Sequence, residues 1–483
     1  MRKLEANHQL QQICLAPQTN DYFPVSAETV DVNIHKDNRD RYVSKLKSWS
    51  SSWPNGSLDS ACPHPVLVTK QHLDQLIHLH EALSLAIEDI IERWWTDEGA
   101  RFPERMPLEP EEEDLLRWLY QNKLLRPYKE CQGSWRPDFL LEHDADQGSE
   151  NFHICEINAR FCWNGYMHTV FSQEAYSVFD VEQRGLVNAA DPGTILKGLL
   201  GQFDRSMPLH IVKGEEHGID VHMFVEFCHH LGIKTRLITP NSLRVIPQRE
   251  GHNSYKLCCL TPDQHSRHGE KIEEIHQLGL ELRQHELHAL SPELKRQISL
   301  RCFNDMRAIF LTHDKRMLGI VLQELESLVT RSILSAEQAA HLEKGIAYTI
   351  LPGSPELEDL IDRSSASEQL KDEYILKPIR SGKGDGIQFG DQLSHADWQV
   401  RLEELRDAQP KPGLTLYVVQ RKVNQPLYDV TLGSGQSVSC HKVGTYHAVN
   451  GQFLGLGTWR CSPGRLCAVS DGASWITSVV CKD

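Results

Sequence analysis

The chain has 483 residues, and at roughly 150 residues per domain this length predicts about three domains with room for sizeable cores. Its 51 Lys and Arg residues are outnumbered by 66 Asp and Glu residues. The formal charge of −15 therefore excludes nucleic acid as the main partner, because a polyanion is repelled. No run of about 18 apolar residues occurs, which excludes a helical membrane span.

The N-terminal sequence Met-Arg-Lys-Leu-Glu is charged and lacks the apolar core of a signal peptide, so we expect a cytoplasmic protein. The number of Cys residues, 13, is odd, and the sequence has no Cys-x-x-Cys motif. Both observations favour buried thiols over disulfides or a zinc cluster. His285 and His288 lack the spacing of a zinc-binding helix.

The first third of the chain predicts an arm followed by a helical layer. Residues 1–65 are polar and indicate an irregular N-terminal arm, because turn-forming residues are frequent there. From Lys70 to Trp95 apolar residues recur with a period of about 3.6, which predicts an amphipathic helix, and Glu109 to Leu119 resembles another. We assign this layer, with the hairpin that follows, to residues 66–205.

Two short segments in this region predict a β-hairpin with one polar face. Trp135–Leu140 carries Arg136 and Asp138 two residues apart, and Phe152–Arg160 carries Glu156 and Asn158 two residues apart, so each pair shares a strand face. If Asp138 lies opposite Glu156, Arg136 lies opposite Asn158. Two adjacent carboxylates repel when buried, so this face predicts a bound cation. The alternative is an exposed hairpin whose charges are solvated.

The middle of the chain predicts a second unit. A short apolar strand at Leu209–Gly214, a helix at Val221–Leu231 and a strand at Thr235–Ile238 form a βαβ pattern typical of a parallel sheet. We therefore expect a Rossmann-like domain over residues 206–305, in which the charged stretch Gly269–Arg301 forms a mostly solvated helical connector. Residues 306–483 again alternate helices and strands, including strands at Tyr374–Ile379 and Leu414–Val419.

The most specific local pattern is a strand that delivers Lys377 into a loop with three alternating glycines. The loop runs from Arg380 through Lys383 and returns as a strand at Ile387–Phe389. Closely spaced glycines let backbone N–H groups approach an anion, so the loop suits a lid over a triphosphate. No helix follows, which excludes a Walker A box. A flexible glycine-rich hairpin is the alternative. The glycines are Gly382, Gly384 and Gly386.

Two later segments fit the same ligand. The apolar strand Tyr417–Gln420 turns abruptly polar, as expected where a backbone edge binds adenine. Gly455-Leu-Gly-Thr-Trp-Arg460 places a cation after two glycines. Each could be an ordinary strand and turn, but in this order they indicate one ATP site.

These segments resemble an ATP-grasp ligase. Asp314–Leu318 at a helix start, Leu376-Lys377-Pro378 with its glycine loop, the Tyr417–Gln420 strand and the Arg460 segment carry the resemblance. It implies an α/β (α+β) fold: an ATP-grasp domain with a preceding Rossmann-like pre-ATP-grasp domain and an N-terminal helical and hairpin region. It also implies that Lys315 and Lys377 contact the phosphates, with Tyr417 and Gln420 near adenine.

ATP-grasp enzymes usually hold magnesium with carboxylates near the C-terminus, yet the tail of this chain has only Asp471 there. The upstream Arg-x-Asp and Glu-x-Asn pairs instead resemble the glutathionylspermidine synthetase type. That resemblance implies Mg²⁺ ligands at Asp138, Glu156 and Asn158, and a charge-stabilising role for Arg136. The departures are Pro137, the absence of an amidase domain and the N-terminal arm.

The resemblance implies ATP-dependent joining of a small-molecule carboxylate and an amine through an acyl phosphate. Arg136, Lys377 and Arg460 would act in catalysis, and Lys383 or Arg380 could contact the γ-phosphate. The alternatives are an ATP-dependent phosphotransferase and a non-catalytic nucleotide-binding scaffold. The sequence identifies neither the substrates nor the oligomeric state.

Overall fold

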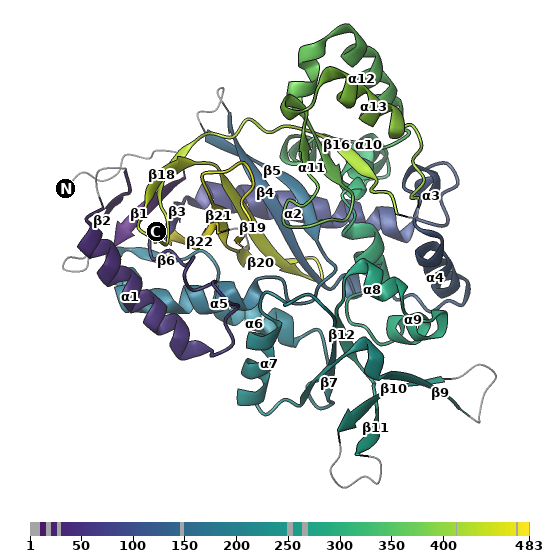
Figure 1. Cartoon of the computed structure of the whole chain (residues 1–483), viewed down its shortest axis with the longest axis horizontal. Coiled ribbons are helices and arrows are strands. Elements are labelled where there is room, and N and C mark those ends of the chain that lie inside the picture. Colours follow the sequence, from purple (N-terminus) through teal and green to yellow (C-terminus); the bar gives the residue numbers. More distant parts are fainter. Residues whose placement is uncertain are drawn as a thin grey trace.

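The computed structural model describes residues 10–15, 21–26, 30–144, 149–248, 255–262, 269–411, 413–469 and 472–482. Helices and sheets alternate along the chain, so the α/β class is confirmed (Figure 1). Asp471 lies outside the described residues.

A central, mostly antiparallel sheet forms the body of the protein. Its strands run in the order β22-β21-β19-β4-β5, and β20 pairs with the edge of β19 (Figure 1). The sheet joins distant parts of the chain, because β19 pairs with β4, which lies more than three hundred residues earlier. The bounds are β4 Ser134–Asp144, β5 Ser149–Asn158, β19 Lys442–Val449, β20 Gln452–Leu456, β21 Trp459–Cys461 and β22 Ser474–Ile476.

The long helix α2, Lys70–Glu92, covers one face of this sheet and confirms the predicted amphipathic helix. Thr69 caps its N-terminus by accepting a hydrogen bond from the His72 backbone N–H. Leu83 and Ile87 lie in the same buried cluster as Trp135 and other sheet residues. The apolar surface that the helix and the sheet bury against each other therefore holds them together. The other face of β4 and β5 is left for polar side chains.

The N-terminal region is only partly irregular, which corrects the prediction for residues 1–65. Helix α1, Val32–Trp49, occupies its middle, and Asp31 caps it by accepting from two backbone N–H groups. Its apolar residues are sparse, so the sequence pattern hides it. A second sheet, in the order β2-β1-β3-β23-β6, ties this region to the chain end. Its strands are β1 Gln11–Leu15, β2 Tyr22–Pro24, β3 Val66–Val68, β6 Leu186–Asn188 and β23 Ser478–Cys481.

The βαβ prediction is confirmed. Strand β7, Leu209–Lys213, pairs in parallel with β8, Thr235–Ile238, and helix α7, Val221–His230, connects them. The charged stretch 269–301 is not simply a solvated helical connector, because its buried strand β12, Leu278–Glu281, pairs in parallel with β7. A small antiparallel sheet projects beside this unit (Figure 1). It contains β9 Leu243–Pro247, β10 Tyr255–Pro262 and β11 Glu270–Glu274.

A smaller unit, residues 349–421, stands above the body and is called the lid unit (Figure 1). Its sheet has the order β13-β16-β14-β15, and Leu376 and Val419 pack on one face beneath helices α12 and α13. Strand β16 begins three residues after the predicted strand at Leu414, which is largely exposed. The bounds are β13 Thr349–Ile350, α12 Pro355–Ala366, β14 Tyr374–Pro378, β15 Gln388–Phe389, α13 His395–Glu404 and β16 Tyr417–Arg421.

The remaining elements surround these sheets. Ser335 and Gln338 form a capping box at the start of α11, and Ser291 caps α9. The elements not yet given are α3 Phe102–Arg105, α4 Pro110–Gln121, α5 Tyr166–Ala175, α6 Pro192–Leu200, α8 Gln284–His288, α9 Pro292–Ser299, α10 Arg316–Thr330, α11 Ala336–Gly345, β17 Tyr428–Thr431 and β18 Ser437–Cys440.

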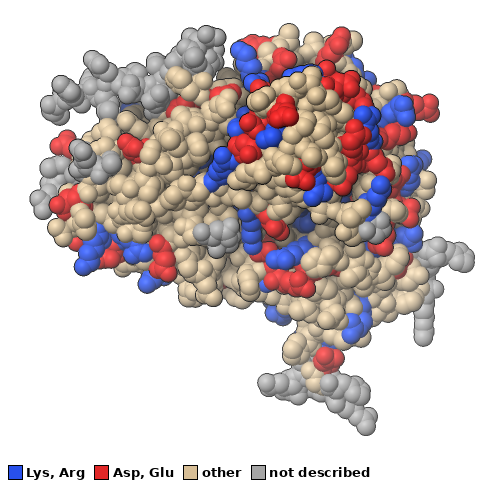
Figure 2. Space-filling model, turned by 45° about the horizontal axis from the view of Figure 1, so that its top comes forward, with Lys and Arg blue, Asp and Glu red and all other residues tan. Residues whose placement is uncertain are grey.

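Surface and cysteine chemistry agree with the composition. All 13 cysteines are free and only Cys481 is exposed, which confirms mostly buried thiols. On the face shown in Figure 2, basic side chains alternate with acidic ones instead of forming one broad basic area. Within the described ranges, every helix is too short or too polar to cross a bilayer. The division into four segments at residues 65, 205 and 305 stays a prediction.

Candidate functional site

The hairpin register agrees with the sequence prediction. Arg136 pairs with Asn158, and Asp138 pairs with Glu156. A β-bulge directly after Asp138 shifts the register by one residue, so the pairing holds where the polar side chains lie. All four polar residues therefore lie on the sheet face opposite helix α2.

Two arginines neutralise the buried carboxylate of Asp138. The Nε of Arg136 donates to Asp138 Oδ1 at 3.1 Å, and Arg460 on β21 also forms an ion pair with Asp138. Burial alone would lower the pKa of Arg460, but Asp138 raises it above its usual value. Arg460 reaches this position because β19 pairs with both β4 and β21. The structure therefore brings together Arg136, Asp138 and Arg460 from distant segments.

Two lysines approach Glu156 from the other side. Lys315 Nζ lies 3.2 Å from the Glu156 carboxylate and donates to the backbone carbonyl of Ser381 at 2.6 Å. Burial alone would raise the pKa of Glu156, but Lys315, Lys377 and Arg460 lower it well below its usual value. Glu156 is therefore ionised at neutral pH.

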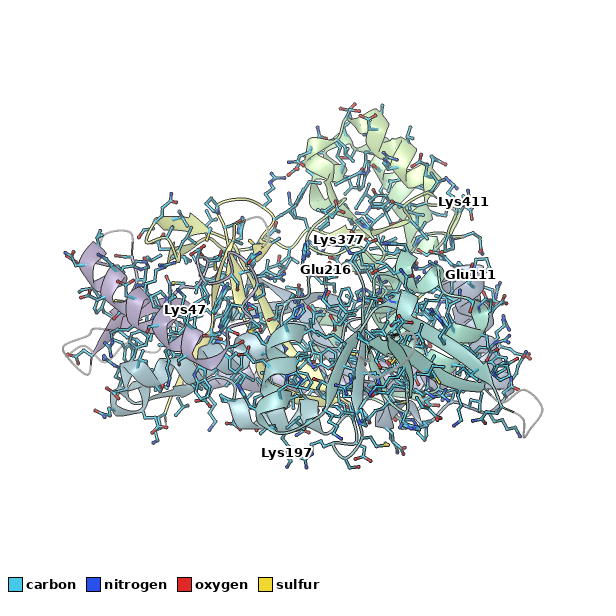
Figure 3. All side chains as sticks on the ribbon, turned by 60° about the horizontal axis from the view of Figure 1, so that its bottom comes forward. Lys47, Glu111, Lys197, Glu216, Lys377 and Lys411 are labelled. Atoms are coloured by element: carbon cyan, nitrogen blue, oxygen red, sulfur yellow. The ribbon has the colours of Figure 1, made fainter. Side chains whose placement is uncertain are left out.

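Lys377 lies on β14 at the base of the lid unit, where Figure 3 labels it. Its side chain alternates with those of Leu376 and Pro378, so it points away from the face that α12 and α13 cover. Lys377 is 6% exposed. The acidic hairpin and the lysine-bearing strand thus converge, as the sequence predicts.

The glycine loop makes a tight turn beside these lysines. Lys383, Gly384 and Gly386 have φ values of 60°, 78° and 75°, a region that glycine adopts without a side-chain penalty. A Cβ at Gly382 would meet no atom within 4 Å, so this side of the loop is open. Lys383 forms an ion pair with Glu216 at 3.0 Å. The loop tip therefore contacts the segment that follows β7.

Arg380 is held in buried ion pairs, so a contact between this residue and the γ-phosphate stays a prediction. Its guanidinium forms buried ion pairs with Glu112 at 2.6 Å and Asp314 at 2.8 Å. Asp314 also pairs with Arg316 at 2.8 Å. Burial alone would raise the pKa of Glu112 and Asp314, but the arginines lower both to about 2. Arg380 therefore anchors the base of the glycine loop.

The predicted adenine strand is already engaged in the lid sheet. The backbone of Tyr417 to Arg421 pairs with β14, and Gln420 also pairs with β13. The Gln420 side chain donates to Thr349 Oγ1 at 2.9 Å and to the carbonyl of Cys155 at 3.3 Å. Gln420 thus joins the lid sheet to β5, and an adenine contact at Tyr417 or Gln420 stays a prediction.

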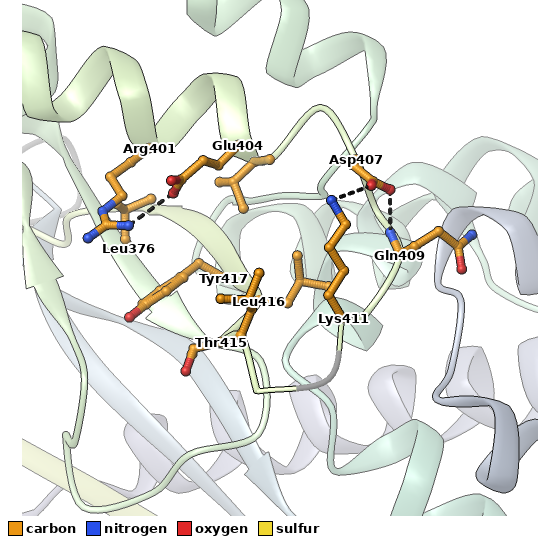
Figure 4. A pocket seen from close by; sticks show the side chains of 11 residues that line it. Leu376, Arg401, Glu404, Asp407, Gln409, Lys411, Thr415, Leu416 and Tyr417 are labelled. Atoms are coloured by element: carbon orange, nitrogen blue, oxygen red, sulfur yellow. Dashed lines mark hydrogen bonds and ion pairs between the residues drawn. The ribbon is translucent and has the colours of Figure 1, made fainter.

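A separate pocket of about 280 Å³ lies on the outer side of the lid unit (Figure 4). Leu376 lines it, whereas Lys377, the next residue on the strand, faces the hairpin. Ion pairs between Arg401 and Glu404 and between Lys411 and Asp407 border it (Figure 4). This pocket is therefore distinct from the carboxylate site.

The segment after Asn158 is mostly core. Cys162, Trp163 and Tyr166 are buried in one apolar cluster, so these side chains belong to the core. Asn164 differs, because its Oδ1 accepts from Arg136 Nη1 at 2.7 Å. No spacing rule predicts this contact, since the loop between β5 and α5 is irregular.

Comparisons with known proteins identify the family. The ATP-grasp enzyme ankG of Aspergillus thermomutatus is 34% identical over 486 residues, which cover 97% of this chain and 99% of that protein. The chain belongs to the ATP-grasp family. The family model described as the AnkG N-terminal domain matches residues 79–311 of this ATP-grasp chain.

Among solved structures, the chain is similar to a glutathione synthetase like-effector, GSS30, from Globodera pallida in apoform. The TM-score is 0.52 at 11% identity, covering 92% of this chain and 97% of that one. Such a low identity shows the fold alone. The ATP-grasp resemblance is confirmed, whereas the glutathionylspermidine synthetase subtype stays a prediction.

Proposed function

We propose that this ATP-grasp enzyme is a Mg²⁺-dependent carboxylate–amine ligase that joins small molecules through an acyl phosphate. One observation carries the proposal: the oxygen-donor face of the hairpin lies directly against Lys315 and the base of the glycine loop. A ligase needs metal ligands and phosphate-binding cations around one reaction centre. The names of the ankG relative and of the glutathione synthetase-like neighbour are consistent with it.

The residues present fit a magnesium ion. Asp138 and Glu156 offer carboxylate oxygens and Asn158 an amide oxygen, the hard ligands that Mg²⁺ prefers. The Asn158 Nδ2 donates to the Arg136 carbonyl at 3.3 Å, whereas its Oδ1 accepts no hydrogen bond within the described part of the chain. The amide oxygen is therefore available. When bound, Mg²⁺ would neutralise and orient the phosphates at this face.

The chain's own side chains align and neutralise the reacting groups. Lys315 and Lys377 would bind phosphate oxygens, joined by backbone N–H groups of the glycine loop from Gly382 to Gly386. Arg136, held by Asp138 and Asn164, would stabilise the charge that develops during transfer, and Arg460 would assist from β21. Lys383 could leave Glu216 for the γ-phosphate when the lid closes.

The proposed reaction has two balanced steps. A carboxylate oxygen attacks the γ-phosphorus of ATP, the bond to ADP breaks, and an acyl phosphate forms. The lone pair of the amine then attacks the acyl carbon, orthophosphate leaves, and the amide nitrogen loses a proton to solvent or buffer. Closure of the lid unit would exclude water, which otherwise hydrolyses the acyl phosphate.

Isotope transfer tests this proposal. The protein is incubated with Mg·ATP, an amine mixture and ¹⁸O-labelled amino and other carboxylic acids, and products are analysed by mass spectrometry. An acyl phosphate transfers one ¹⁸O atom into orthophosphate and yields an amide. A phosphomonoester with ADP and no released orthophosphate would instead identify a phosphotransferase, and the absence of acid-stimulated ADP formation would contradict both. Lys377→Ala should abolish turnover, whereas Lys411→Ala, on the exposed outer pocket, should not.

A further inference from the structure

One buried arginine lacks an anionic partner. Three of the four most buried arginines form ion pairs with carboxylates in the described part of the chain, whereas Arg160 forms none there. Arg160 is 8% exposed. The paired ones are Arg93, Arg307 and Arg316. An uncompensated buried guanidinium costs free energy, because the lost hydration is not replaced.

The hydrogen bonds of Arg160 do not replace that hydration. Its Nη2 donates to Gln284 Oε1 at 3.5 Å, the outer limit for a hydrogen bond, and its Nε is buried without a partner in the structure as described. The nearby carboxylates are occupied, since Arg380 pairs with both Glu112 and Asp314. The guanidinium of Arg160 is therefore left without an ion-pair partner among the described residues.

Arg160 follows the proposed metal-ligand strand directly in sequence and does not lie on a remote surface. It follows Asn158 by two residues, at the end of β5. The neighbouring Ala159 backbone N–H donates to His313 Nδ1 at 3.4 Å, and His313 stands two residues before Lys315. The chain at Arg160 therefore lies against the segment that leads into Lys315.

We infer that Arg160 binds an oxyanion of the substrates, because its buried guanidinium forms no ion pair within the described residues and extends from the chain segment that joins the metal-ligand strand to the contact with His313. This inference rests on the proposed function, which supplies two candidate oxyanions. They are the terminal phosphate of ATP and the carboxylate of the acid. Both match the two-pronged geometry of a guanidinium, which forms paired hydrogen bonds with planar or tetrahedral oxyanions. The bound oxyanion supplies the charge that the folded chain lacks.

Ligand-induced stabilisation tests this inference without turnover. The thermal midpoint of the wild type is compared with those of Arg160→Met, Arg160→Gln and the control Arg236→Met, whose side chain is 45% exposed on β8. Each is measured alone, with Mg·ADP, with Mg·AMP-PNP, with Mg·AMP-PNP plus succinate, and with orthophosphate alone. Binding to the folded state raises the midpoint with ligand concentration.

We expect Arg160→Met to unfold at the same or a higher temperature than the wild type without ligands, because a methionine fills the site without a charge. If Arg160 binds the γ-phosphate, both variants lose the extra shift that AMP-PNP gives over ADP. If it binds the acid, they keep that shift but lose the one from succinate. Arg236→Met should match the wild type throughout.

Two results would distinguish a failure of the Arg160 inference from a failure of the proposed function. Equal ligand shifts in the wild type and in both Arg160 variants, in all arms, overturn the role of Arg160. If neither nucleotide shifts the wild type, the proposed function fails. The orthophosphate arm then decides on Arg160 by itself: a wild-type shift that both variants lose supports the inference, and any other result overturns it.

Discussion

Replacing Glu156 by glutamine removes one of two negative charges from a face that holds four positive ones. The side chain keeps its length and its position opposite Asp138 on the hairpin. Lys315, now 3.2 Å from the carboxylate, loses its anionic partner and keeps only the Ser381 carbonyl. The four cations are Arg136, Lys315, Lys377 and Arg460.

The expected loss of stability in Glu156→Gln follows from this geometry. At an effective dielectric constant near 20, two charges at this separation attract by roughly 5 kcal/mol before desolvation is counted. Desolvation offsets most of that, and the Glu156 side chain is 19% exposed, so we expect the free energy of unfolding to fall by about 1–3 kcal/mol. Loss of a metal ligand should weaken the magnesium enhancement of nucleotide binding by at least 10–100-fold, the effect that outer partners of metal ligands already have.

Calorimetric titration of AMP-PNP, with Mg²⁺ and with EDTA, measures both effects. Glu156→Gln should bind metal-free AMP-PNP at least as tightly as the wild type, because the site becomes more positive, while the gain from Mg²⁺ largely disappears. The matched control is Glu142→Gln at the other end of β4, where Glu142 pairs with His153. A variant with the wild-type gain from Mg²⁺ would refute the assignment of Glu156 as a ligand.

Three further predictions concern the surroundings of the site. Arg380→Met removes one cationic partner from each of two buried carboxylates, Glu112 and Asp314, and leaves them only His288 and Arg316, so urea unfolding should show a loss of about 3–5 kcal/mol, and a loss below 1 kcal/mol contradicts the anchor. Hydrogen bonds to Glu109 and Glu112 raise the pKa of His288 to about 9, so protonated His288 contributes stability below pH ~6.5 that is lost as the pH rises through 9. His288→Asn should flatten the pH–stability curve between pH ~6.5 and 9. An unaltered curve would contradict the stabilising role of protonated His288. Lys383→Gln breaks an exposed ion pair, so hydrogen exchange at the glycine loop should accelerate while global stability changes by less than about 1 kcal/mol; unchanged exchange would argue against the contact.

A surface variant controls for the arginine change. Arg406 is 44% exposed and pairs with Glu358 and Glu403 on the outside of the lid unit. Arg406→Met should change the free energy of unfolding by no more than about 0.5 kcal/mol, because exposed ion pairs contribute little. The difference between Arg380→Met and Arg406→Met then isolates the effect of burial.

The parts of the fold that the sequence predicts are those with a local period. Helix α2 repeats apolar residues with the helical period, and β7–α7–β8 alternates short apolar strands with a helix. The prediction for the stretch 269–301 is wrong because its charges surround β12, whose four residues carry too short a pattern to stand out. Burial of β12 comes from its pairing with β7, which is a tertiary contact.

The same division applies to the site. Arg136, Asp138, Glu156 and Asn158 follow from two period-two pairs and a hairpin register, all of which are local. The use of Arg380 as an anchor does not, because Glu112 lies 268 residues away in sequence. A cation directly before a glycine loop suits a phosphate equally well, so only the packing of α4 against this region decides between the two uses.

The distant cations also bear on how the proposed metal ion would bind. Asp138 already pairs with Arg136 and, across 322 residues of sequence, with Arg460. A metal ion that takes the oxygens of Asp138 and Glu156 leaves Arg460 and Lys315 without those partners, in a region where unpaired charge is costly. A polyphosphate supplies the missing negative charge at the same time. Metal and nucleotide should therefore bind cooperatively, because each lowers the free-energy cost of binding the other. This cooperativity follows from the ion pairs and not from the metal ligands alone.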